Sequence, residues 1–189
     1  MKLIVIDNYD SFTYNLVYAV KKITGLPVDV VRNDEVNINE ISGYDKIILS
    51  PGPGLPSEAG LLTEIIRVFA PSKSILGVCL GHQAIGEVFG GRLLNLTRVF
   101  HGVATHVKTT GNLSVLFKGI PESFNAGRYH SWIVDKENLP DCLEITSVDN
   151  EGMIMSLKHK ELNVEGVQFH PESVLTPLGE KMIENWINS

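Results

Sequence analysis

The first half of the chain alternates short, mainly apolar runs with segments whose apolar residues recur at helical spacing. The apolar runs cover residues 3–6, 28–31, 46–50 and 74–78, and the helical segments cover residues 12–23, 61–69 and 80–89. Strands that are apolar on both faces, each followed by a helix, are typical of a parallel sheet covered on both sides. We expect Ser11 to cap the first helix and Gly25 to end it, because these residue types suit those positions.

The second half of the chain has a different pattern. Short alternating segments at residues 102–108, 144–148, 153–157 and 164–169 predict antiparallel or mixed strands, and residues 179–187 predict a closing helix. The chain has 189 residues and no evident linker, repeat or low-complexity segment. We therefore predict a single α/β domain over residues 1–189, with a mainly parallel central sheet flanked by helices and additional antiparallel strands.

Composition narrows the expected partners and compartment. The net charge of -6 opposes binding to phosphate backbones, so nucleic acid is not an expected partner. No apolar run approaches the roughly 18 residues of a membrane span, so no membrane association is expected. The first apolar run turns polar at Asp7, which indicates a buried strand and not a signal peptide. We expect a cytoplasmic protein, and we interpret two matches to the glycosylation acceptor pattern, at residues 95–97 and 112–114, as chance.

The most specific local motif is Gly77-Val78-Cys79-Leu80-Gly81, which stands between an apolar run and a helical segment. A nucleophile flanked by glycines at a strand-to-helix junction forms a sharp turn that lifts the central side chain out of the sheet. The following helix N-terminus favours a thiolate on Cys79, and the N–H of Leu80 is placed to stabilise an oxyanion. An isolated cysteine here would be interpreted as a small buried residue, but the two glycines favour catalysis.

A catalytic thiol needs an imidazole that takes its proton and returns it to the leaving amine. Among the six histidines, His170 follows an apolar segment and directly precedes Pro171-Glu172. We expect Pro171 to keep this segment extended, so that Glu172 lies on the same side as His170 and orients its ring. Alone, the tripeptide would be interpreted as a capped turn. It gains weight because Cys79 has no other evident base.

A stiff loop, Ser50-Pro51-Gly52-Pro53-Gly54-Leu55-Pro56, follows the third apolar run. The prolines restrict its backbone and the glycines leave its N–H groups open to a ligand, so we expect it to supply a second oxyanion donor. It is not a P-loop, because no Gly-Lys-Ser/Thr follows, and the chain has no dinucleotide-binding glycine pattern. Without the other motifs the loop would be interpreted as a rigid turn.

Residues 50–54, 77–83 and 166–172 together resemble the motifs of the class I, or triad, glutamine amidotransferases, and the resemblance extends over essentially the whole chain. It implies a flavodoxin-like fold. It also implies that Cys79, His170 and Glu172 hydrolyse L-glutamine to glutamate and ammonia through a γ-glutamyl thioester. The implied contacts to glutamine or its oxyanion are Gly52, Pro53, Gly54, Leu80, Gln83, Ser131 and Trp132, the last two through their backbone.

Within this family, residues 7–16 and 128–131 look like component II of anthranilate synthase or of aminodeoxychorismate synthase. The resemblance implies that ammonia passes to a synthase subunit that uses chorismate. Gly54 is more typical of the tryptophan-pathway members, because folate-pathway members often carry cysteine there. Trp132 departs from the leucine that is common at its position, which leaves the shape of the adjoining pocket open.

The chain offers no evident region for chorismate, so we expect the synthase to be a separate polypeptide that also carries the magnesium used by this family. No cofactor or metal site is expected in this chain, because His101 and His106 lack companion ligands at metal-binding spacing. Other functions fit parts of the pattern. They are the same chemistry for aminodeoxychorismate or for both pathways, a stand-alone γ-glutamyl hydrolase, and a binding module without catalysis.

Overall fold

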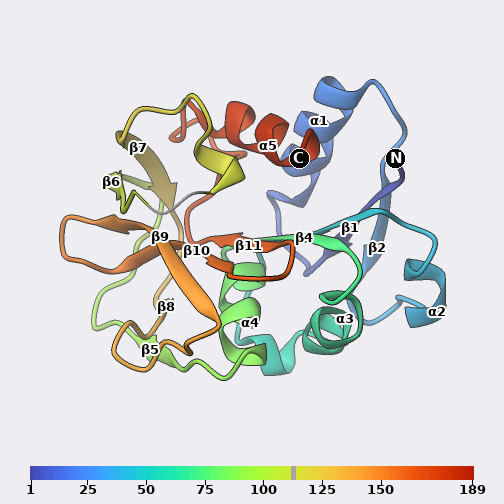
Figure 1. Ribbon diagram of the computed structural model, residues 1–189, viewed down its shortest axis with the longest axis horizontal. Coiled ribbons are helices and arrows are strands. Elements are labelled where there is room, and N and C mark those ends of the chain that lie inside the picture. Colours follow the sequence, from blue (N-terminus) through green and yellow to red (C-terminus); the bar gives the residue numbers. More distant parts are fainter. Residues whose placement is uncertain (112–113) are drawn as a thin grey trace.

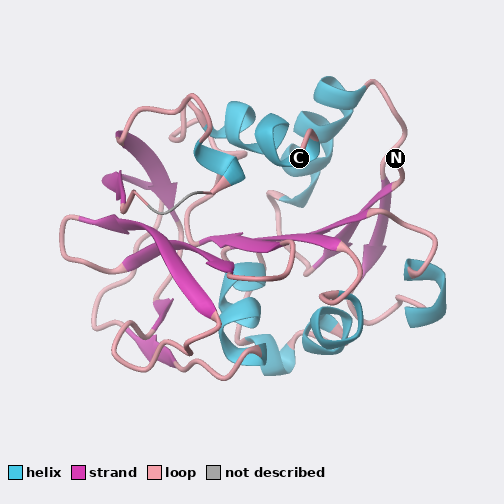
Figure 2. Cartoon of the chain, viewed as in Figure 1, coloured by secondary structure: helices cyan, strands magenta, loops and turns pink. Residues whose placement is uncertain are grey.

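The computed structural model describes residues 1–111 and 114–189, so the second glycosylation-pattern match lies partly outside the described residues. Within these residues one nine-stranded sheet crosses the molecule and a two-stranded sheet lies beside it (Figures 1 and 2). The strand order of the large sheet is β2-β1-β3-β4-β11-β10-β9-β6-β7. The predicted α/β class is confirmed.

The large sheet contains β1 (Leu3–Asp7), β2 (Asp29–Arg32), β3 (Lys46–Leu49), β4 (Ser74–Val78), β6 (Val103–Thr109), β7 (Ser123–Arg128), β9 (Leu143–Asp149), β10 (Ile154–His159) and β11 (Val164–Val167). The small sheet pairs β5 (Leu93–Asn95) with β8 (Trp132–Val134). The helices are α1 (Thr13–Thr24), α2 (Ile38–Ile41), α3 (Leu62–Phe69), α4 (Leu80–Val88) and α5 (Gly179–Ile187), with 3-10 turns at Pro56–Glu58 and Val115–Phe117. Among the described residues, no helix combines the length and the apolar character that crossing a bilayer requires.

The large sheet divides into a parallel and an antiparallel half. β1 pairs in parallel with β2 and β3, β3 with β4, and β4 with β11. This order is that of a flavodoxin-like sheet, in which ligands bind outside the carboxyl ends of the strands. Beyond β11, the strands β10, β9, β6 and β7 pair antiparallel, so the predicted antiparallel strands extend one side of the sheet.

Helices cover both faces of the parallel half, and the side chains of each strand alternate between two cores. Leu3 and Val5 of β1 pack in the core beneath α1 and α5, whereas Ile4 and Ile6 pack in the core against α3 and α4. Figure 1 shows these two helix pairs on opposite sides of the sheet. β1, β3 and β4 are therefore buried on both faces, whereas the edge strand β2 is only half-buried.

The two ends of α1 differ in how they agree with the prediction. Gly25 ends the helix in the left-handed conformation (φ 67°), as predicted, but Ser11 does not cap it. The helix has Phe12 at its N-cap position and no side-chain cap, and Asp10 Oδ2 accepts a hydrogen bond from the N–H of Phe12 just before the helix (2.7 Å). Asp7 Oδ1 adds a second bond from the hydroxyl of Thr13 (2.8 Å).

Trp186 of α5 is a large buried side chain in the core between the sheet and the helices α1 and α5. It is 1% exposed, and the Nζ of Lys46 lies 4.7 Å from its ring centre and donates to its carbonyl (2.9 Å). We predict that Trp186→Ala lowers the free energy of unfolding by about 3–5 kcal/mol, through lost burial and the cavity left behind. Urea unfolding followed by circular dichroism measures this loss. Trp186→Phe should cost less, and a loss below about 1 kcal/mol in the alanine variant would contradict the prediction.

Candidate active site

The loops that follow β1, β3, β4 and β11 meet at the carboxyl ends of the parallel strands, and two cavities lie between them. The smaller, of about 200 Å³, is lined by Gly52, Pro53, Gly54, Cys79, Gln83, Tyr129, His130, Ser131 and Trp132. The larger, of about 390 Å³, is lined by Tyr9, Asp10, Ser11, Phe12, Pro51, Gly52, Pro53, Cys79, His101, Tyr129 and His170. Cys79 therefore lies in the wall between the two cavities, and the smaller cavity gathers most of the residues singled out in the sequence.

Cys79 occupies a sharp turn between β4 and α4 that both neighbouring glycines make possible. A β-carbon at Gly77 would lie 2.5 Å from the backbone of Gly81, and one at Gly81 would lie 2.5 Å from the carbonyl oxygen of Leu49. Cys79 itself has φ 51° and ψ -98°, a sparsely populated conformation for a non-glycine residue. Its N–H donates to the carbonyl of Val167 (2.8 Å), which ties the turn to β11.

His170 follows β11 and is held on several sides. Its Nδ1 lies 2.7 Å from Oε1 of the buried Glu172, which leaves Nε2 as the ring nitrogen available to Cys79. The rings of Phe12 and Tyr129 pack against the imidazole, with centroid distances of 5.7 and 4.8 Å. Burial lowers the pKa of His170, but the interaction with nearby Cys79, together with the hydrogen bond to Glu172 and its charge, outweighs burial and raises the pKa to about 10. The imidazole is thus protonated beside the sulfur at neutral pH.

The extended conformation expected for residues 170–172 was wrong. These residues form a turn closed by a hydrogen bond from the N–H of Ser173 to the carbonyl of His170 (3.2 Å). The fixed φ of Pro171 suits the second position of such a turn. The turn still brings Glu172 to the imidazole, and the N–H of His170 is anchored to the carbonyl of Gly127 (2.9 Å).

The Pro/Gly loop after β3 is held by the loop after β1. The N–H of Asn8 donates to Ser50 Oγ (2.9 Å), and Asn8 Nδ2 donates to the carbonyl of Ser50 (2.7 Å). A β-carbon at Gly52 would lie 2.6 Å from Asn8, so only glycine permits this contact. Leu80 is the first residue of α4, so its N–H has no acceptor within the helix, and its side chain packs in the core.

Two residues next to the sulfur were not singled out from the sequence. Gln168 is fully buried, and its Nε2 lies 3.6 Å from Cys79 Sγ. Tyr129 lines both cavities, and its hydroxyl lies 3.1 Å from Ser173 Oγ. Both stand inside sequence runs that drew attention as motifs, and Gln168 precedes His170 by two residues. That spacing alone does not identify Gln168, because its contact with the sulfur depends on how β4 and β11 pair.

Two further histidines lie near the site. His82 is fully buried, with its ring against Gly166, and burial lowers its pKa to about 4. His101 lines the larger cavity, with its ring 6.1 Å from that of Tyr129. In the part of the chain that the structure describes, no three His, Cys, Asp or Glu side chains gather in a way that could hold a metal ion.

Known proteins share the sequence and the fold. Residues 4–189 match the family model described as glutamine amidotransferase class-I. An anthranilate synthase component 2 from Pseudomonas putida is 47% identical, with 99% of this chain and 96% of the relative covered. A Bacillus subtilis protein named aminodeoxychorismate/anthranilate synthase component 2 is 44% identical over the same shares. The chain belongs to the class I glutamine amidotransferase family.

A solved structure has the same fold as this chain. A Thermoplasma acidophilum protein, described as one of the subunits of a GMP synthase, superposes with a TM-score of 0.88 at 26% identity. The superposition covers 100% of this chain and 92% of the other. The shared fold includes the mixed sheet flanked by helices, as predicted.

The buried His82 makes the fold sensitive to acid. Its pKa is about 4 in the folded chain, against about 6.5 in an unfolded one, so the unfolded chain binds more protons between these values. The free energy of unfolding should therefore fall as the pH drops from about 6.5 to about 4, by up to roughly 3 kcal/mol from this ring. His82→Gln, which cannot titrate, should show a smaller fall in urea unfolding across this range. An equal fall in both proteins would contradict the prediction.

Proposed function

We propose that this chain hydrolyses L-glutamine with Cys79, His170 and Glu172 and delivers the ammonia to a chorismate-using synthase subunit for anthranilate formation. The observation that carries the proposal is the position of Cys79 at a strained turn, between a small polar cavity and the buried His170–Glu172 pair. Membership of the class I glutamine amidotransferase family supports the same chemistry.

In the proposed reaction His170 first takes the thiol proton of Cys79, which gives a thiolate and an imidazolium. The Cys79 thiolate attacks the side-chain amide carbon of glutamine, and the N–H of Leu80 with the loop at Gly52 stabilises the oxyanion. His170 gives its proton to the leaving nitrogen, so the C–N bond breaks, ammonia leaves and a γ-glutamyl thioester remains. The neutral imidazole then takes a proton from water as its oxygen attacks the thioester carbon. The C–S bond breaks, which releases glutamate and restores the thiolate beside the imidazolium, steadied by Glu172.

We assign glutamine to the smaller cavity. Its volume of about 200 Å³ lies below the roughly 300–1,000 Å³ of cavities for drug-sized ligands, which suits a single amino acid. Both amide hydrogens of Gln83 have acceptors, in Trp132 and Gln168, so its oxygen is the atom suited to accept from the amino group of glutamine. We assign the remaining contacts to Pro53, Gly54, Ser131 and the backbone of Trp132.

We propose that the ammonia is used for anthranilate formation. The Pseudomonas putida relative is named for anthranilate synthase alone, and Gly54 is the residue expected of that branch. The double name of the Bacillus subtilis relative favours aminodeoxychorismate synthesis, or use in both pathways, as the second candidate. We also propose a cytoplasmic location, because both cysteines are free thiols, and magnesium bound by the partner synthase.

The first test removes the nucleophile. Cys79→Ser should lower glutamate release by at least about a thousandfold, because a hydroxyl is a far weaker nucleophile at neutral pH. Its thermal midpoint should match that of the parent chain. With the partner synthase present, ammonium salt added directly should still yield the aromatic product. Unchanged glutamate release in the serine variant would eliminate the mechanism.

The second test identifies the partner. The chain is mixed with the synthase subunits of anthranilate and of aminodeoxychorismate formation from the same cell, with glutamine and chorismate supplied. We expect glutamine-dependent anthranilate in the first mixture, detected by fluorescence. Product in the second mixture alone would assign the chain to the other pathway. Ammonia release that is the same with and without either synthase, together with hydrolysis of γ-glutamyl peptides, would indicate a stand-alone hydrolase.

A further inference from the structure

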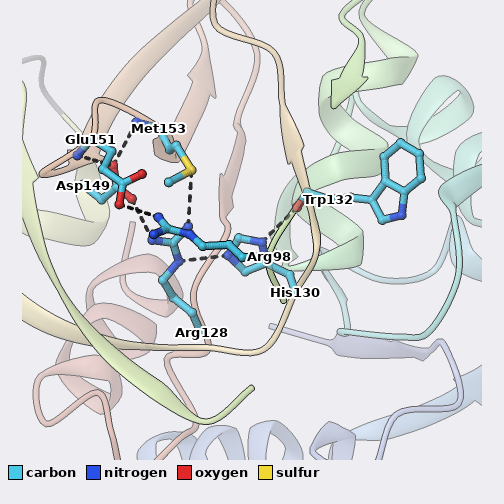
Figure 3. Close-up of polar contacts among 7 residues, drawn as sticks. All are labelled: Arg98, Arg128, His130, Trp132, Asp149, Glu151 and Met153. Carbon is cyan, nitrogen blue, oxygen red and sulfur yellow. Dashed lines mark hydrogen bonds and ion pairs between the residues drawn. The ribbon is translucent and has the colours of Figure 1, made fainter. Parts of the chain in front are cut away.

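A buried ion pair stands at one end of a row of hydrogen bonds that leads to the smaller cavity (Figure 3). Arg128 Nη1 donates to Asp149 Oδ2 (2.7 Å), and Arg128 Nε donates to His130 Nε2 (3.0 Å). His130 Nδ1 lies 2.9 Å from the carbonyl oxygen of Trp132, and the same oxygen accepts from Gln83 Nε2 (2.9 Å). The row therefore joins the end of β9 to the cavity wall beside the nucleophile.

The partners of His130 determine which of its ring nitrogens carries the proton. A guanidinium can only donate, so Nε2 of His130 must accept from Arg128. In a neutral ring the hydrogen is then on Nδ1, which donates to the carbonyl of Trp132. Burial, reinforced by the charge of Arg128, lowers the pKa of His130 to about 3, so the ring is neutral at physiological pH. Arg128 thus makes His130 a donor directed at the cavity wall.

Stability alone is a poor explanation for the ion pair. The side chains of Arg128 and Asp149 are only 1% and 5% exposed, and removing two charges from water offsets most of their attraction. The surroundings instead fix the direction of the guanidinium. Asp149 Oδ1 accepts two N–H groups of the turn between β9 and β10, and the ring centre of Phe100 lies 3.5 Å from the guanidinium carbon of Arg128.

The row continues past the shared carbonyl toward the nucleophile. Gln83 Nε2 lies 3.3 Å from Gln168 Oε1, and Gln168 Nε2 lies 3.6 Å from Cys79 Sγ. The carbonyl of Trp132 has two donors, one for each lone pair, and the amide of Gln83 has an acceptor for each hydrogen. Removing the Nδ1–H donor of His130 would therefore allow both the carbonyl of Trp132 and the amide of Gln83 to reorient.

We propose that Arg128 and His130 are positioning residues for glutamine, because the Nδ1–H of His130 holds the carbonyl of Trp132 and, through it, the amide of Gln83. This inference rests on the proposed function, since it requires glutamine in the smaller cavity. The ion pair between Arg128 and Asp149 then serves to fix the tautomer of His130. Glutamine then binds to Gln83 and Trp132, and the orientation of these two residues depends on Arg128, which lies outside the cavity.

Two substitutions at His130 separate this role from a purely structural one. In His130→Asn, the side-chain nitrogen takes the position of Nδ1, so the bond to Trp132 is kept and the acceptor for Arg128 is lost. In His130→Gln, the amide lies near the position of Nε2, so an acceptor for Arg128 is kept and the donor to Trp132 is lost. The asparagine variant should therefore be the less stable, because it leaves a buried guanidinium N–H unpaired.

The measurement is protection of Cys79 by glutamine. The full chain is treated with iodoacetamide at increasing glutamine concentration, and alkylation of the Cys79 peptide is followed by mass spectrometry, which separates it from Cys142. We expect the half-protecting glutamine concentration to rise about three- to tenfold in His130→Gln, the effect of one lost hydrogen bond, and to change less than about twofold in His130→Asn. The thermal midpoint should fall more in His130→Asn than in His130→Gln. The rate of alkylation without glutamine should be equal in all three proteins.

Other outcomes overturn the inference. Equal protection in both variants and the parent chain, or a loss of protection that follows the loss of stability, would leave His130 a structural residue only. An absence of protection in the parent chain would instead refute glutamine binding beside Cys79, and with it the proposed function. If neither His130 variant folds, Phe100→Leu decides, because Phe100 packs against both Arg128 and the ring of His130 but does not itself line the smaller cavity. A higher half-protecting concentration in that variant supports the inference, and an unchanged one overturns it.

Discussion

The close backbone contact between β3, β4 and α4 is the constraint on which the site depends. Gly77 and Gly81 let the chain turn from strand to helix where no β-carbon fits, and Gly81 also lies against the carbonyl of Leu49. Cys79 between them has to adopt a left-handed φ of 51°. The conformation persists because the strand and the helix on either side are buried in extended cores. The position of the sulfur is thus set by the packing of whole layers.

The two halves of the sheet contribute different parts of the site. The parallel half provides Cys79, the proposed nucleophile, and the loop at Gly52, at the strand ends where such sheets bind ligands. The antiparallel half provides the walls, because residues 129–132 follow β7. That strand stands last in the sheet order, and yet the carbonyl of its Gly127 accepts from the N–H of His170 after β11. The antiparallel half therefore curls back toward the central strands, as Figure 1 shows.

The sequence predicted those parts of the molecule in which one periodicity dominates. The buried parallel strands and the helices that follow them are of this kind. The turn at Cys79 could also be predicted, because its two glycines have the spacing that a sharp strand-to-helix turn requires. β7 was missed because its pattern includes Arg128, whose burial depends on Asp149, a partner 21 positions away. The contact of Gln168 with the sulfur likewise depends on how β4 and β11 pair, which no local pattern reveals.

Cys79 lines two cavities that also share Gly52, Pro53 and Tyr129, and their remaining walls differ in chemistry. Gln83 and Trp132 line only the smaller one, whereas His170 and His101 line only the larger. If glutamine binds in the smaller cavity as proposed, its amide carbon would meet the sulfur from that side, and His170 would supply the proton from the other. The ammonia would then leave into the space lined by Tyr9 and His101, while the acyl group would stay on the opposite side of the sulfur.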